Sequence, residues 1–145
     1  SLALFEQIGD GGNPWGMIKA LLGLGKALRH QQDHQRSREC LRRALEMAWN
    51  LPSIPNCLRS LAEIGALLAS QGHYDRAVYP LTFALHQPAS QAETKSLAER
   101  VLTSLEGRVG QEVLTEALAQ AGSLEIDEMV EQFIHSSPNR EAEQK

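Results

Sequence analysis

The sequence predicts an all-α protein built from stacked helix pairs and closed by a helical C-terminal cap. Aliphatic residues supply most of the 42% hydrophobic content of the 145 residues, and aromatic residues make up only 5%. The apolar residues recur at spacings of three, four and seven, which is the period of one helix face. One pattern of apolar residues also occurs twice, 40 residues apart, which indicates a structural repeat.

The repeat is visible when "LLGLGKAL" (residues 21–28) is placed over "LAEIGALL" (residues 61–68). Glycine inside a helix costs about 0.5–1 kcal/mol relative to alanine. Its recurrence as Gly25 and Gly65 therefore predicts close helix crossings, in which Gly25 faces Ser37 and Gly65 faces Ala77. Gly23 has no such explanation, because Glu63 takes its place in the second copy. The residues predicted to pack the repeats are Leu21, Leu24, Gly25, Ser37, Leu41, Ala44, Leu61, Ile64, Gly65, Tyr74, Ala77, Leu81 and Ala84.

Helix ends can be assigned in both repeats. Repeat one is predicted over residues 14–50, with Asn13 as an N-cap and Pro14 at the first helical position. Repeat two is predicted over residues 55–88, opened by Pro55 and turned at Gly72. The four predicted helices cover residues 14–31, 34–50, 55–70 and 74–86.

A helical cap is predicted over residues 90–135, because the last unit of a repeat array would otherwise expose its stacking surface. A capping box formed by Ser90 and Glu93 opens its first helix. A second helix ends at Gly122, and Ser123 caps a third.

The two ends of the chain lead to separate predictions. Residues 1–10 read as the second helix of a truncated repeat, so we expect further repeats upstream in a longer chain. This open end could also associate with a second copy through Leu2, Leu4, Phe5 and Ile8. Residues 136–145 lack an apolar anchor and are predicted to be disordered.

The repeat resembles the tetratricopeptide repeat, a helix–turn–helix motif with matching glycine, alanine and large apolar positions. Leucine replaces the usual aromatics here, and the period is 40 residues rather than about 34. The resemblance implies a right-handed α-solenoid over about residues 14–86. The later stretch, with "HQPAS", "ET" and "EVL", resembles the C-terminal part of bacterial signal-transduction (STAND-type) ATPases and LuxR-type regulators. In those proteins such repeats form a sensor arm downstream of a nucleotide-binding domain.

The resemblance also implies a groove lined by the first helix of each unit. Carried onto this chain, the groove positions are Lys19, Leu22, Lys26, Arg29 and His30 in repeat one, and Arg59, Ala62, Ala66, Ala69 and Ser70 in repeat two. One half is basic and the other small and apolar, which favours an acidic protein or peptide partner. A merely solvated basic face is the alternative. Leu22 departs from the asparagine and lysine pattern of the family's carboxylate clamp, which argues against a receptor for chaperone tails.

Charge and cysteine content exclude several classes of function. The net charge is −4, and all of the acidic excess lies in residues 61–145, which disfavours direct nucleic-acid binding. No apolar run approaches the about 18 residues of a membrane span. Cys40 and Cys57 make neither a disulfide framework nor a CxxC motif, which is typical of a cytoplasmic protein with reduced thiols.

No motif for a cofactor, phosphate loop or activated nucleophile is present, so we expect a non-catalytic domain. The leading hypothesis is an interaction or sensor domain from the C-terminal part of a larger bacterial regulator. A stand-alone adaptor is the second hypothesis. The third is a small metal-dependent helical enzyme that uses His30, His34 or the two cysteines.

Overall fold

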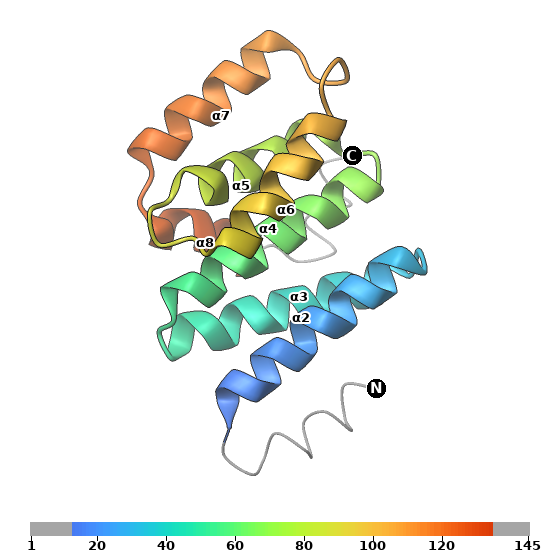
Figure 1. Ribbon diagram of the computed structural model, residues 1–145, viewed down its shortest axis with the longest axis vertical. Helices are drawn as coiled ribbons and strands as arrows, with labels where there is room; N and C mark the ends of the chain where they lie inside the picture. The colour runs from blue at the N-terminus through green and yellow to red at the C-terminus, as the bar shows by residue number, and fades with distance from the viewer. Residues whose placement is uncertain (1–12, 135–145) are drawn as a thin grey trace.

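The computed structural model describes residues 13–134 and folds there into helices alone, which confirms the all-α prediction (Figure 1). The helices are α2 (Pro14–His30), α3 (His34–Asn50), α4 (Ile54–Ser70), α5 (Tyr74–His86), α6 (Ala92–Ser104), α7 (Gln111–Ser123) and α8 (Ile126–Ile134). The predictions for residues 1–10 and 136–145, including self-association through Leu2, Leu4, Phe5 and Ile8, lie outside the described residues.

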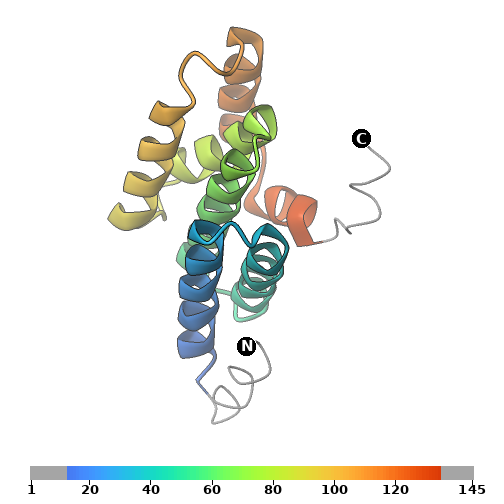
Figure 2. The same cartoon turned by 90° about the vertical axis from the view of Figure 1, so that its right-hand side faces the viewer.

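The helices stack in chain order, as in a helical-repeat solenoid. Each helix from α2 to α5 packs against the next one along the chain, and α4 also contacts α2 and α6. In Figure 2, α6 lies on one side of the column formed by α2 and α4, and α3 and α8 lie on the other. The order breaks at α7, which packs against α5, and α8 turns back to pack against α3. The central helix is therefore α4, which contacts four others.

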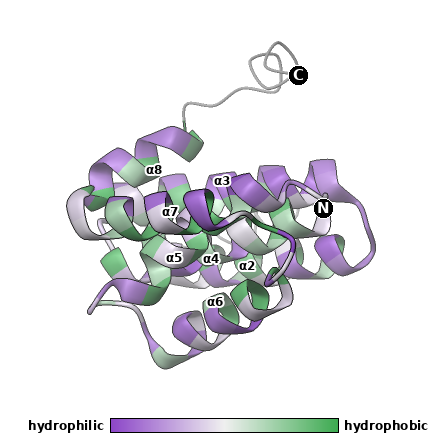
Figure 3. Cartoon of the chain, turned by 90° about the horizontal axis from the view of Figure 1, so that it is seen from above, coloured by the Kyte–Doolittle hydropathy of each residue, from purple (hydrophilic) through white to green (hydrophobic). Residues whose placement is uncertain are grey.

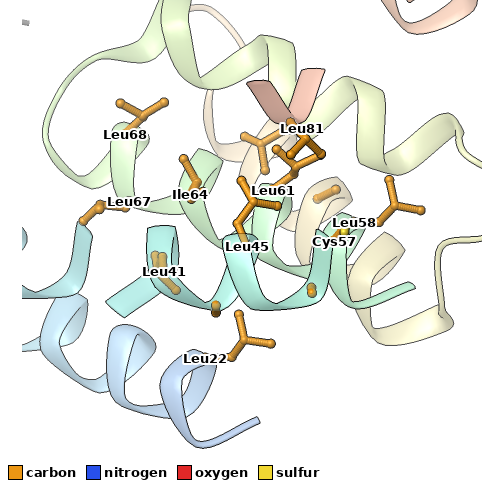
Figure 4. Close-up of a cluster of buried hydrophobic side chains, with 14 of the residues drawn as sticks. Leu22, Leu41, Leu45, Cys57, Leu58, Leu61, Ile64, Leu67, Leu68 and Leu81 are labelled. Atoms are coloured by element: carbon orange, nitrogen blue, oxygen red, sulfur yellow. The ribbon is translucent and has the colours of Figure 1, made fainter. Parts of the chain in front are cut away.

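The core is aliphatic, as the composition predicts. Buried leucines from α3, α4 and α5 meet between the helices, among them Leu41, Leu58 and Leu81 (Figure 4). Hydrophilic residues cover the outward sides of α3 and α8 in Figure 3. Of the thirteen residues predicted to pack the repeats, Leu24 and Tyr74 are half-buried and the others are buried.

Both recurring glycines lie at close helix crossings. A Cβ atom on Gly25 would stand 2.5 Å from Leu41 Cδ2, and one on Gly65 would stand 2.5 Å from Leu81 Cγ. The side chains nearest to the two glycines are thus Leu41 and Leu81 of the partner helices, rather than the predicted Ser37 and Ala77. Ser37 still contributes, because its hydroxyl donates a hydrogen bond to the Gly25 carbonyl at 2.7 Å.

The turn inside each repeat requires a left-handed residue at the same place. Gly72 has a φ of +85° between α4 and α5, and Gln32, 40 residues earlier, has a φ of +65° between α2 and α3. Glycine reaches this conformation without strain, whereas glutamine does not. At the start of α2, Pro14 is in the first turn and the side chain of Asn13 accepts a hydrogen bond from the Gly16 N–H, which confirms that predicted N-terminus.

Two predicted caps are wrong. Ser90 does not cap α6, because its buried hydroxyl donates to the Ala84 carbonyl at 2.6 Å and so closes the link after α5. Ser123 lies at the end of α7, one residue past Gly122, and its hydroxyl donates to the Ala119 carbonyl. The helix that follows begins three residues later, at Ile126, so Ser123 does not cap it.

Candidate functional site

The exposed side of α2, α4 and α6, here called the α2–α4–α6 face, carries two neighbouring hollows. The first hollow has a volume of about 380 Å³ and is lined mainly by Lys26, Arg59, Glu63, Glu93, Leu97 and Arg100. The second has a volume of about 300 Å³ and is lined mainly by Arg29, Ala69, Ser70, Tyr74, Ser104 and Arg108. Five of these side chains are cationic and two are carboxylates, so the face is basic although the chain is acidic.

A buried carboxylate organises the face. Glu63 is 1% exposed because it lies on the central helix α4. Its carboxylate forms ion pairs with Arg29 at 3.7 Å and with Arg59 at 3.4 Å. Oε1 of Glu63 and Nε of Arg29 make no hydrogen bond to any described residue. A buried charge needs such pairing, because leaving water is unfavourable for an unpaired ion. Glu63 therefore holds two guanidinium groups on this face.

The first hollow contains paired and unpaired cations. Arg59 lies between Glu63 and the exposed Glu93, whose Oε2 is 3.1 Å from Nη1 of Arg59. Lys26 from α2 and Arg100 from α6 line the same hollow and have no ion pair within residues 13–134. Since α4 lies between α2 and α6, these two cations flank the central helix. The hollow can therefore neutralise anionic groups of a ligand.

The second hollow combines a cation with an aromatic ring. The guanidinium carbon of Arg108 lies 5.4 Å from the centroid of the Tyr74 ring, within the range of a cation–π contact. Nη1 of Arg108 also donates to the Tyr74 hydroxyl at 3.3 Å. This contact ties the link after α6 to the first turn of α5. The link therefore contributes a basic group next to the small side chains of α4.

The structure divides the predicted groove residues into three groups. Those that line a hollow are Lys26, Arg29, Arg59, Ala66, Ala69 and Ser70. Lys19 and His30 are exposed but line neither hollow. Leu22 and Ala62 are buried, so their assignment to an open groove is wrong. Leu22 belongs to the core (Figure 4), and Ala62 packs in a small cluster with Leu97 because α6 crosses this part of α4.

Sequence reasoning missed Glu63 and the whole contribution of α6. Glu63 lies within an apolar run and four residues after Arg59, a spacing that places the two charges on one helix face. That spacing could have identified the ion pair. Arg100 gave no such indication, because the sequence predicts only a cap for the array in this segment. Its role depends on how α6 packs across α4.

The other candidate chemistry is not assembled in the described part of the chain. No group of three or more His, Cys, Asp and Glu side chains there could hold a metal ion. Both thiols are buried and free, and burial raises the pKa of Cys57 to about 12. Burial also raises the pKa of Cys40, with a smaller contribution from Glu39. None of the helices in residues 13–134 combines the length and the apolar character needed to cross a membrane.

Comparison with known families agrees with the helix pairing. Residues 16–85 match the family model described as tetratricopeptide repeat, from the first turn of α2 to the end of α5. This part of the chain therefore resembles a tetratricopeptide repeat region, a kind of region that is typically non-catalytic and mediates protein interactions. Comparisons with curated proteins and with solved structures gave no match.

Proposed function

We propose that this protein is a non-catalytic interaction domain that binds an acidic segment of a partner protein on the α2–α4–α6 face. The observation that carries the proposal is the first hollow, where Lys26 and Arg100 approach from two helices without a carboxylate partner among the described residues. Electrostatic complementarity at such a surface mainly increases the association rate and the specificity.

The ion pairs of Glu63 support the same proposal. Arg29 and Arg59 are long, flexible side chains that would lose conformational entropy on binding a ligand. Their pairing with Glu63 orders them beforehand, which lowers that entropic loss. The small side chains of Ala69 and Ser70 leave room for a peptide backbone next to Arg29.

Selection from a random peptide library displayed on phage tests the proposal. We expect the selected peptides to be enriched in Asp and Glu and to bind more weakly as salt rises. Binding should be lost in the variant Lys26→Glu/Arg100→Glu. The matched control is Lys95→Glu/Arg36→Glu, which changes the net charge equally away from both hollows. Peptides without acidic enrichment, or equal binding by the two variants, would show the proposal to be wrong.

We also propose that this domain is the sensor or assembly part of a larger bacterial signalling ATPase or transcriptional regulator in the cytoplasm. The support is the resemblance of the stretch from "HQPAS" to "LEIDE" to the C-terminal part of such proteins, together with two free, buried thiols. The natural reading frame tests this. A nucleotide-binding or DNA-binding domain upstream of Ser1 supports the proposal, and a start codon next to further repeats supports a stand-alone adaptor.

A further inference from the structure

A second surface lies between α6 and α7, and its lining shares only Leu105 with the basic hollows. The paired helices α2 and α3, and likewise α4 and α5, pack closely along their lengths, but α6 and α7 scarcely touch. Both instead pack against α5. The α6–α7 groove that results has a volume of about 390 Å³.

The sequence explains why this pair separates. The turns inside the first two pairs have three residues, whereas the link from α6 to α7 has six, Leu105 to Gly110, with Gly107 at a φ of +81°. On its other side, α7 is held to α5 by a hydrogen bond that the Tyr79 hydroxyl donates to Glu116 at 3.0 Å. The longer link and this anchor leave the space between α6 and α7 unfilled by the described residues.

The groove is lined by leucines and by two carboxylates, with His86 also among its lining residues. Its apolar lining includes Leu85 of α5, Leu102 of α6, and Leu114 and Leu118 of α7. Leu118 is 54% exposed, one of two large hydrophobic side chains in residues 13–134 that are so exposed. Glu99 and Glu106 stand on the α6 side, and no lysine or arginine among the described residues lines the groove.

We propose that the α6–α7 groove binds an amphipathic helix of a partner protein, with leucine-like side chains on one face and lysines or arginines on its flanks. The apolar walls would receive the apolar face, and Glu99 and Glu106 would pair with the flanking cations. Each wall is a helix of 13 residues, about 20 Å long, which matches roughly three and a half turns of a bound helix.

The two ends of this chain complement the groove poorly. Residues 1–12 carry apolar side chains but only acidic charges, Glu6 and Asp10. Residues 135–145 contain no leucine, isoleucine, valine or aromatic residue. The two carboxylates of the groove, Glu99 and Glu106, therefore favour a basic helix over either of these two segments.

Two synthetic peptides test the proposal, both of about 18 residues with leucines at a helical spacing of i, i+3, i+4 and i+7. One has lysines at the other positions and the second has glutamates. Fluorescence anisotropy should show binding of the leucine–lysine peptide only, with a gain in helical circular dichroism. The variant Leu118→Ser should weaken binding about tenfold, as expected for one lost leucine contact. Its far-ultraviolet spectrum should stay unchanged, because Leu118 is largely exposed.

A charge reversal makes the test specific. The variant Glu99→Lys/Glu106→Lys should lose the leucine–lysine peptide and gain the leucine–glutamate peptide. The control Glu112→Lys/Glu131→Lys reverses two exposed carboxylates outside the groove and should behave like the natural protein. Equal loss in the control would mean attraction by net charge alone and would overturn the proposal, as would full binding by Leu118→Ser.

Two further measurements distinguish a helix bound in this groove from a peptide bound at the basic hollows and from a dimer of this chain. The variant Lys26→Glu/Arg100→Glu should still bind the leucine–lysine peptide, so failure of the acidic-segment proposal leaves this one standing. Sedimentation analysis should find that Leu118→Ser leaves the oligomeric state of the protein unchanged. A dimer that this variant converts to a monomer would show that a second copy occupies the groove, and the proposal would be wrong.

Discussion

Three glycines on two helices provide a direct test of the repeat packing, through the substitutions Gly23→Ala, Gly25→Ala and Gly65→Ala. Alanine favours a helix over glycine by about 0.5–1 kcal/mol, and this gain applies to all three. At Gly23 nothing lies within 4 Å of the added Cβ atom, so the gain remains. We therefore expect Gly23→Ala to raise the free energy of unfolding by about 0.5–1 kcal/mol.

At the other two positions, overpacking opposes this gain. The added Cβ would stand 2.5 Å from Leu41 Cδ2 or from Leu81 Cγ, and both leucines are fully buried. Overpacking in a core costs about 1–3 kcal/mol, so the net loss of stability is up to about 2.5 kcal/mol. Gly65→Ala should be the more destabilising, because the Cβ would also approach the backbone oxygen of Ala77 at 3.3 Å.

Urea unfolding followed by far-ultraviolet circular dichroism measures these changes, with the transition midpoint and slope compared among the variants. The decisive outcome is the sign. Gly23→Ala should shift the midpoint upward, and the other two should shift it downward. An upward shift for all three would show that the helix crossings are not tight and would refute the packing explanation.

Three further predictions concern charge, backbone strain and pH. Glu63→Ala should lower the free energy of unfolding by about 3 kcal/mol, because it leaves two arginines without their buried partner. Glu93→Ala removes a carboxylate that is 80% exposed and should change the free energy of unfolding little. Equal effects of the two variants in urea unfolding would contradict the importance of the buried ion pairs. Gln32→Gly should stabilise the protein by up to about 1 kcal/mol, and Gly72→Ala should destabilise it, because both positions have a positive φ. The melting temperature measures both changes. A lower melting temperature for Gln32→Gly would contradict the inferred strain at Gln32. Burial raises the pKa of Cys57 from 9.0 to about 12, so the unfolded chain loses the thiol proton first and the free energy of unfolding should fall as pH rises from about 9 toward 12. Urea unfolding at a series of pH values in this range measures that fall, which should be smaller in Cys57→Ala. An equal dependence of the free energy of unfolding on pH in this variant would contradict the assignment.

Local features of the sequence predicted most of the helices. Asn13 and Pro14 define the start of α2 through hydrogen bonding and a restricted φ, and both effects act within a few residues. The recurrence of Gly25 as Gly65 indicated a close crossing, because a missing side chain matters only where another helix comes near. Ser90 shows where local reasoning fails, since a hydroxyl that can cap a helix can equally bond to another carbonyl, and packing decided between them.

The sequence alone determined the helical class, the repeat and the basic character of α2, because periodicity, propensity and charge are properties of neighbouring residues. Only the tertiary structure decided that Glu63 is buried and paired with two arginines. It also decided that α6 covers Ala62 and adds Arg100 to the α2–α4–α6 face, and that α6 and α7 lie apart. The physical reason is that burial, ion pairing and grooves arise from residues distant in the chain. Which of those residues meet depends on the angle and offset at which whole helices pack.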